Sequence, residues 1–404
     1  MARILIISPG SPCRNPRPVK EAETLGRAGH DVTLLTVFES AALSEQERTL
    51  TTGAPYRHEV VDHDVSSTAR LWRRIRRRLA VKSTELGLES LHALGHAGSL
   101  HRRATEIPAD LTIVHNELPH WIGCDLLDQD RRVAADFEDW HSEDLLPAER
   151  GGRPLQHMRE NERRLLRETA YTSTTSGALS QALTARYGGS SPLVLTNSFP
   201  LQPAPRAGSA GEPPAFFWFS QTVGPGRGLE EFCAAWAQTT QPSRLVLLGQ
   251  VRSGYDQLLL SLLPAAFRSR ISFLPMVAPG DLPGVIACHD IGLALEQAFI
   301  VNRDLTITNK ILQYLNAGLA VVASDTAGQR EVLAHAPGSG ILAHLERPTE
   351  LTAQLDSLLA DRPRLAAMAA TARRAAETTY CWEKEAPKLI ARVALALAAP
   401  VHST

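Results

Sequence analysis

The sequence predicts an α/β protein made of two doubly wound domains, each built on a parallel sheet. The chain has 404 residues. This is more than a single hydrophobic core usually supports, because domains typically hold about 100–200 residues. Short apolar runs alternate with helical patterns in both halves, as expected for parallel strands joined by helical crossovers. Residues 200–214, rich in proline, glycine and alanine, separate the halves and are typical of a linker.

The first domain is expected to span residues 1–199. It opens with an apolar strand at 4–7, a helix at about 16–28 that stops at Gly29, and a second strand at 31–36, which together form a βαβ unit. Further strands are predicted at 111–115, 133–136 and 193–197.

The second domain is expected to span residues 215–379 and repeats the alternation. A glycine-rich loop at 224–228 follows its first strand and precedes a helix from about 229, and the tail from about 348 to 397 has helical periodicity. Strands are predicted at 215–219, 244–248, 271–274, 291–295 and 319–323.

Composition and charge argue against several classes of protein. A net charge of -1 gives no global basic field for nucleic acid. Five widely spaced cysteines, an odd number, favour a reduced cytoplasmic protein over a disulfide framework. The N-terminal apolar run is too short for a signal peptide, and no run approaches the ~18 apolar residues of a membrane-spanning helix.

The densest motif is TNKILQYLNAGLAVVASD. Thr308 is a good N-cap residue, and Asn309 and Lys310 open a helix. Free N–H groups at a helix N-terminus, together with a lysine, suit a pyrophosphate. Gln313 shares a face with Lys310 and can reach a ribose. An ordinary capped helix with a solvated lysine is the alternative.

The glycine-rich loop is the second motif. Gly224 and Gly226 let backbone approach a ligand closely, and Arg227 offers a guanidinium suited to phosphate. A lone glycine-rich loop is weak support, but this one opens the domain that also carries Lys310.

Polar residues follow two strands of the first half. His115 and Glu117 end one strand, and Asp136, Glu138 and His141 end the next. A neutral histidine or a carboxylate there can bind hydroxyl groups or act as a base. Strand ends also carry such residues without catalysis, and this alternative stays open.

An arginine-rich segment runs from Arg70 to Arg78 and holds six arginines around apolar residues that include Trp72. It predicts a basic amphipathic helix suited to an anionic membrane surface or an acidic acceptor. The equal alternative is a solvated helix whose apolar stripe packs inward.

These motifs together make the chain resemble family 4 glycosyltransferases of the GT-B fold over nearly its whole length. The resemblance rests on RILIISPG, GHDVTLLT, ADLTIVHNELP, ADFEDWHSED, RGLEE and, most specifically, TNKILQYLNAGLAVVASD. It implies two Rossmann-like domains facing across a cleft, with a helix at about 380–400 crossing back to the first domain. It also implies metal-independent transfer of a sugar from a nucleotide-diphosphate-sugar, mostly with retention, and no other cofactor.

The resemblance assigns roles to both domains. Arg227, Lys310 and the helix N-terminus at Asn309 would bind the donor diphosphate, while His115 and Asp136 would lie near the reacting centre. The acceptor, a saccharide, a lipid-linked molecule or a small molecule, would bind the first domain. Acceptor-side candidates are Ser11, Glu117, Glu138 and His141.

The sequence departs from the family at one motif. The family commonly has two glutamates separated by seven residues, whereas Gln313 and Leu305 occupy those positions here. Glu296, at the end of the preceding strand, is the candidate for the missing catalytic carboxylate. The alternatives are an inverting transferase with His115 as base, an epimerase-like GT-B enzyme, and a non-catalytic subunit that binds a nucleotide-sugar or a partner.

Overall fold

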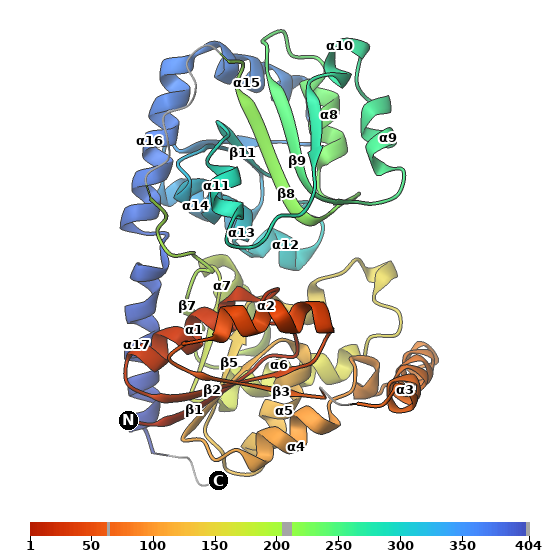
Figure 1. Cartoon of the computed structure of the whole chain (residues 1–404), viewed down its shortest axis with the longest axis vertical. Coiled ribbons are helices and arrows are strands. Elements are labelled where there is room, and N and C mark those ends of the chain that lie inside the picture. Colours follow the sequence, from red (N-terminus) through yellow and green to blue (C-terminus); the bar gives the residue numbers. More distant parts are fainter. Residues whose placement is uncertain (63–64, 204–211, 401–404) are drawn as a thin grey trace. The chain divides into compact units, whose positions relative to one another are not determined.

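The computed structural model describes residues 1–62, 65–203 and 212–400. The chain forms two compact units, residues 1–195 with 386–404, and residues 196–385. Each described unit is a parallel sheet with helices on both faces (Figure 1). The predicted fold class is confirmed. Most of the predicted linker, residues 204–211, lies outside the described residues.

The first unit holds a sheet whose described strands run in the order β3-β2-β1-β4-β5-β6-β7. Its strands are β1 (Arg3–Ile7), β2 (Asp31–Val37), β3 (Arg57–Val61), β4 (Leu111–His115), β5 (Val133–Phe137), β6 (Tyr171–Thr174) and β7 (Leu193–Val194). Its helices are α1 (Pro16–Arg27), α2 (Ala41–Thr51), α3 (Ser67–Glu85), α4 (Gly98–Glu106), α5 (Glu117–Leu127), α6 (Leu155–Glu168) and α7 (Gly177–Tyr187). Short 3-10 turns lie at Leu91–Ala93, His141–Glu143 and Pro147–Glu149.

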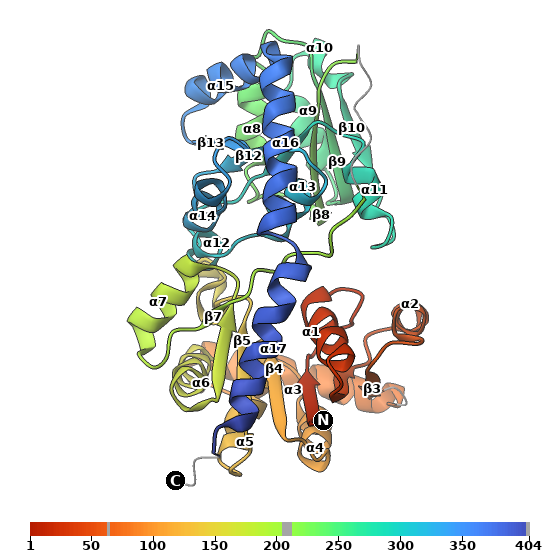
Figure 2. The ribbon, with the colours of Figure 1, turned by 90° about the vertical axis from the view of Figure 1, so that its left-hand side faces the viewer.

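The last helix, α17 (Trp382–Ala398), begins in the second unit and belongs to the first from residue 386 onward. Leu389 and Val393 are buried, and the Arg392 guanidinium lies 5.7 Å from the ring centroid of Tyr171. Figure 2 shows this helix lying across the first sheet beside α1. The predicted return of the C-terminal helix to the first domain is therefore confirmed.

The second unit holds a sheet whose described strands run in the order β10-β9-β8-β11-β12-β13. Its strands are β8 (Ala215–Val223), β9 (Arg244–Val251), β10 (Ile271–Leu274), β11 (Ile291–Ala294), β12 (Ala320–Ser324) and β13 (Gly340–Ala343). Its helices are α8 (Leu229–Trp236), α9 (Tyr255–Ser261), α10 (Ala265–Arg268), α11 (Leu282–Ile286), α12 (Val301–Leu305), α13 (Asn309–Asn316), α14 (Ala327–His335), α15 (Pro348–Ala360) and α16 (Arg362–Thr378).

Strand β8 explains why the strands of the second half read as continuous apolar runs rather than as alternating polar and apolar residues. Phe216 and Trp218 point into the core on one face of the sheet, while Phe217 and Phe219 point into the core on the other face. Because helices cover both faces of the sheet, residues 215–219 of this central parallel strand are all buried. Across the described residues, no helix combines the length and hydropathy of a membrane span.

The order of the strands in each sheet indicates where the candidate sites lie. The order reverses between β1 and β4 in the first unit and between β8 and β11 in the second. In open α/β sheets, ligands bind beyond the carboxyl ends of the strands at such reversals. The loops after these four strands are therefore the positions at which each unit can bind a ligand.

Candidate functional site

The loop after β8 reverses direction on two left-handed glycines. Gly226 has φ 76° and Gly228 has φ 75°, a region that costs little only for glycine. A Cβ on Gly228 would lie 2.6 Å from Leu345 Cδ1, so the loop also packs too closely for a side chain. This geometry carries Arg227 to the end of β11, where Arg303 donates from Nη1 to the Gly226 carbonyl at 2.8 Å.

Helix α13 begins at the position that the sequence predicts. Thr308 is its N-cap, with extended backbone (φ -77°, ψ 150°), but its hydroxyl makes no capping bond. Thr308 Oγ1 is buried without a hydrogen-bond partner among the described residues. A buried polar atom without a partner is costly, and here it stands beside the N–H groups that open a helix. The predicted N-cap position is confirmed.

Glu296 links the two predicted donor motifs. Lys310 Nζ lies 2.7 Å from Glu296 Oε1, and Arg227 Nη1 lies 3.1 Å from Oε2. The side chains of Glu296 and Lys310 are 2% and 11% exposed. Ser324 Oγ accepts the Glu296 backbone N–H at 2.7 Å, which fixes the strand end that carries the carboxylate.

Burial and neighbouring charges shift the pKa values of Glu296 and Lys310 in opposite directions. Burial by itself would raise the pKa of Glu296, but the charges of Lys310 and Arg227 outweigh it, and the pKa lies below its ordinary value. Burial is the largest influence on Lys310 and lowers the pKa of its ammonium, which Glu296 offsets only in part. The positive charges of Arg227 and Arg303 lower that pKa further. Three cations therefore surround one buried carboxylate.

Sequence reasoning missed Arg303. It lies on α12, and the only signal in the sequence was an arginine seven residues before Lys310. Gln313 lies one turn beyond Lys310 on α13 and is partly exposed. The structure thus brings Gly226, Arg227, Glu296 and Lys310 together at one end of the second sheet.

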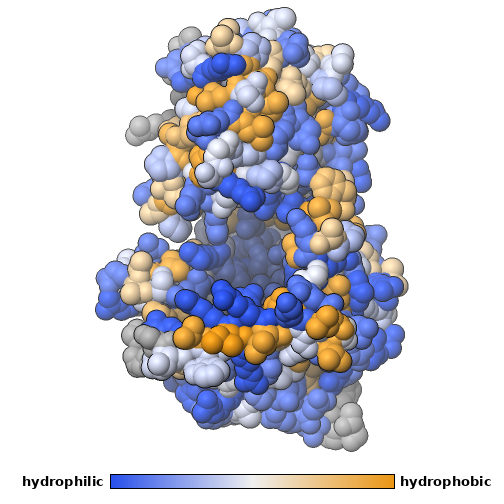
Figure 3. Space-filling view, turned by 90° about the vertical axis from the view of Figure 1, so that its right-hand side faces the viewer, coloured by the Kyte–Doolittle hydropathy of each residue, from blue (hydrophilic) through white to orange (hydrophobic). Residues whose placement is uncertain are grey.

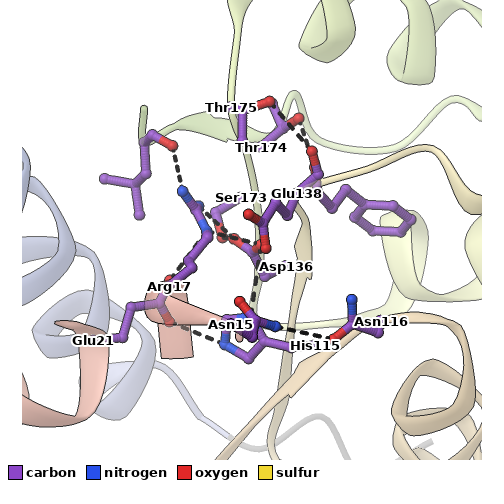
Figure 4. A network of polar contacts seen from close by, with 12 residues as sticks. Asn15, Arg17, Glu21, His115, Asn116, Asp136, Glu138, Ser173, Thr174 and Thr175 are labelled. Carbon is purple, nitrogen blue, oxygen red and sulfur yellow. Dashed lines mark hydrogen bonds and ion pairs between the residues drawn. The ribbon is translucent and has the colours of Figure 1, made fainter. Parts of the chain in front are cut away.

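In the first unit, the strand ends hold a buried group of four charged side chains (Figure 4). Arg17 on α1 donates from Nε to Asp136 Oδ1 at 2.9 Å and from Nη2 to Oδ2 at 2.5 Å. His115 Nε2 lies 3.2 Å from Glu21 Oε2, and Nδ1 lies 3.7 Å from Asp136 Oδ1. Arg17 Nη1 also donates to the Leu195 carbonyl at 2.7 Å.

Two acidic and two basic side chains make up this group. Burial would lower the pKa of His115, but Glu21 and Asp136 raise it above its ordinary value. Arg17 and His115 hold the pKa of Asp136 low despite its burial. His115 and Asp136 are each 1% exposed, so both side chains contact this group and not the surface. Their catalytic roles stay predictions, and sequence reasoning missed Arg17 and Glu21 because an i, i+4 ion pair on a helix normally lies on a solvated face.

A pocket of about 390 Å³ lies beside this group, at the strand-order reversal of the first unit. Asn116, directly after β4, has a positive φ of 71°, and its Oδ1 accepts from Asn15 Nδ2 at 3.3 Å. A positive φ at a non-glycine residue is uncommon and costs conformational energy. The pocket is lined by Pro9, Gly10, Arg14, Asn15, Leu94, Asn116, Glu117, Leu118, Glu138 and Asp139.

Predicted acceptor-side residues divide between the pocket lining and the layer behind it. Glu117 and Glu138 line the pocket. His141 is buried behind Glu117, with Nδ1 3.3 Å from Glu117 Oε2. Ser11 is fully buried, and its backbone N–H donates to Glu39 Oε1 at 2.7 Å. Burial, followed by the charge of Asp139, raises the pKa of Glu138 to about 7, so this carboxyl can exchange a proton near neutral pH.

The two sheets and their strand-end sites define a class: the fold is that of the GT-B glycosyltransferases. Solved structures with this fold include a sucrose-phosphate synthase from Thermosynechococcus elongatus (TM-score 0.73, 14% identity, covering 99% of this chain and 100% of that one). HepE of Anabaena, solved with UDP and glucose, has a TM-score of 0.69 at 17% identity, covering 98% and 100% of the two chains. TarM of S. aureus has a TM-score of 0.70 at 9% identity, covering 99% and 100%.

The family assignment comes from the second unit. Residues 213–361 match the family described as glycosyl transferases group 1, which agrees with the resemblance found in the sequence. Among curated proteins, the spore coat protein SA of Bacillus subtilis (strain 168) is 22% identical over 128 residues, which are 32% of this chain. The aligned region spans about a third of that relative's length.

Proposed function

We propose that this chain transfers a sugar from a nucleotide-diphosphate-sugar to an acceptor hydroxyl. The observation that carries the proposal is the cluster of Arg227, Arg303 and Lys310 around Glu296 at the N-terminus of α13. A diphosphate needs fixed cations and N–H donors, and both converge there. The group 1 match over residues 213–361 and the solved complex of HepE with UDP-glucose support the same assignment.

In the proposed reaction, the second unit stabilises the leaving group. The acceptor oxygen forms a bond to the anomeric carbon while the bond from that carbon to the diphosphate oxygen breaks, and the diphosphate takes the electron pair. Arg227, Lys310 and the helix dipole stabilise this charge, which is the task that a metal ion performs in other enzymes. We therefore propose metal-independent transfer, with Thr308 and Gln313 binding the donor's polar groups.

Glu296 has a defined place in this proposal. It holds Lys310 and Arg227 in position before the donor binds, and it supplies the carboxylate that the sequence motif lacks. A ligand diphosphate replaces part of its interaction with the two cations. The assembled and mutually oriented charges support donor binding, which an active transferase and a non-catalytic binding subunit both need, so a transfer assay has to separate the two.

The pocket of the first unit is the proposed acceptor site. Glu138, whose pKa is about 7, is the lining residue best suited to take the proton of an acceptor hydroxyl, either directly or after the departing phosphate. His115 and Asp136 act behind it as positioning residues, since both are buried. A saccharide, a lipid-linked saccharide or a small natural product fits a polar pocket of this kind, and we propose retention of configuration from the family resemblance.

A transfer assay tests the proposal. Nucleotide-sugars with different bases and sugars are incubated with acceptor mixtures, with and without a chelator, and released nucleoside diphosphate is measured. We expect release with one donor that persists with chelator and is lost in Lys310→Met but not in Lys384→Met, which alters an exposed lysine. The anomeric configuration of the product, read by NMR, separates retention from inversion. Donor binding with no release in any mixture would support the non-catalytic alternative instead.

A further inference from the structure

Helix α3 turns an apolar stripe toward solvent. Leu71, Trp72, Ile75 and Leu79 are 57%, 70%, 36% and 66% exposed. At about 100° per residue, these four positions fall within one arc of about 100° on the helix. The sequence left open whether this stripe packs inward, and the structure shows that it does not.

The opposite face of α3 holds the helix to the first unit. Arg73 Nη1 lies 2.6 Å from Asp62 Oδ2, and Arg77 Nε donates to the Ala93 carbonyl at 3.3 Å. Ala80 is buried on this face. The orientation of the helix is therefore fixed by contacts on its inner side, and the exposure of the stripe is not the result of a helix without partners.

Four further cations lie along one edge of the stripe. Arg70, Arg74, Arg78 and Lys82 are exposed and make no ion pair with any residue in the described ranges. A shallow hollow of about 420 Å³ runs along the helix between them, lined by Arg74, Arg77, Arg78, Val81, Lys82 and Glu85. Figure 3 shows a band of hydrophobic side chains beside a row of hydrophilic ones on this side of the molecule.

We propose that α3 docks the protein on an anionic membrane surface, lying in the plane of the interface. An apolar face with a tryptophan, bordered by exposed arginines and a lysine, inserts among acyl chains while its cations meet lipid phosphates. A second copy of this chain is the less suited occupant, because joining two such stripes would bring eight exposed cations together, and like charges across an interface are costly. The proposal rests on α3 alone and stands apart from the proposed sugar transfer.

Co-sedimentation with vesicles tests this docking. The full chain is mixed with vesicles of phosphatidylcholine alone or with phosphatidylglycerol at about a two-to-one ratio, at low and high salt. We expect binding to the mixed vesicles only, weakened by salt because exposed charges are screened. Each cation near an anionic surface contributes about a fivefold change in partition, so Arg70→Gln, Arg74→Gln and Arg78→Gln together should weaken binding roughly 100-fold.

Two further variants test the apolar stripe separately from the cations and control for the loss of charge. Trp72→Ser with Leu79→Ser should also reduce binding, while leaving thermal unfolding unchanged because both residues are exposed. The control variant carries Arg186→Gln, Arg364→Gln and Arg374→Gln, which together remove the same charge from exposed positions elsewhere. It should bind the vesicles as the wild type does. Equal binding by the α3 variants and this control would overturn the proposal. Absence of vesicle binding, with self-association that Trp72→Ser abolishes in sedimentation velocity, would identify the stripe as an interface between copies and would also overturn it.

Discussion

Replacing Glu296 by glutamine tests the charge cluster of the second unit. The substitution keeps the size and hydrogen-bonding capacity of the side chain and removes its charge. Lys310 then has no carboxylate at 2.7 Å, and Arg227 and Arg303 continue to repel it. The folded protein should lose stability, while its affinity for a nucleoside diphosphate should rise, because the ligand no longer competes with an internal carboxylate.

The expected loss of stability follows from distance and burial. At 2.7 Å and an effective dielectric constant of about 20, the pair attracts by about 6 kcal/mol before desolvation is counted. Desolvation offsets part of this, and removing one member of a buried pair typically costs about 3–5 kcal/mol. We expect a loss in this range for Glu296→Gln. Glu296→Leu with Lys310→Leu should be milder than Glu296→Gln, since neither charge is left buried.

Chemical denaturation, followed by the fluorescence of the second unit's buried tryptophans, measures these differences. Glu350→Gln is the matched control, because its partner Arg347 and Glu350 itself are 59% and 46% exposed, and exposed pairs contribute at most about 1 kcal/mol. A Glu296→Gln variant as stable as the Glu350→Gln control would refute the reasoning, as would weaker diphosphate binding.

Three further predictions concern packing, the buried charges and pH. Gly292→Ala places a Cβ 2.2 Å from Tyr314 Cγ, so α13 must shift, and unfolding experiments should show a loss of about 1–3 kcal/mol together with weaker nucleotide binding. Asp136→Asn takes from the fully buried Arg17 the carboxylate that accepts from its Nε and Nη2, leaving Glu21 Oε1 at 3.5 Å from Nε, and should cost about 3–5 kcal/mol; a loss no larger than that of a surface mutation would show that the pair is not formed. The pKa of Glu138 is raised from 4.5 to about 7, so the folded state retains a proton that the unfolded state releases. Its contribution to stability is therefore full below pH 4.5 and is lost as the pH rises through about 7. Denaturation across this range should show that decline, relative to Glu138→Gln; identical pH profiles would contradict it.

Most of the fold could be predicted because its central strands are buried on both faces and read as apolar runs. The strands at 111–115 and 271–274 match β4 and β10 in both bounds. Three strands were missed. β3 (RHEVV) and β6 (YTST) are largely polar, whereas β13 (GILA) is a short apolar run like β10, and its local pattern does not explain why it was missed. Their pairing with a neighbouring strand, which a local pattern does not contain, makes them strands.

The parts of the site that depend on the local sequence at a helix start could be predicted. Thr308, Asn309 and Lys310 stand at the start of α13 as predicted, and the glycine loop carries Arg227 as expected. Arg303, Arg17 and Glu21 could not be found, because their roles come from groups on other elements that only the tertiary fold brings near. These groups are Glu296 for Arg303, Asp136 for Arg17 and His115 for Glu21. For the same reason, the burial of His115 and Asp136 within one ion-pair group was not visible from two separate strand ends.

The central claim is that the second unit binds a nucleoside diphosphate through Lys310 and its neighbours. Calorimetric titration of UDP, GDP, dTDP, ADP and CMP forms, free and sugar-linked, into the wild type and Lys310→Ala tests it most directly. The account predicts selective binding of one base, weakened at least about tenfold in the variant because a charge-assisted contact is lost. Equal affinity in both proteins, or binding of none of these ligands, would contradict it.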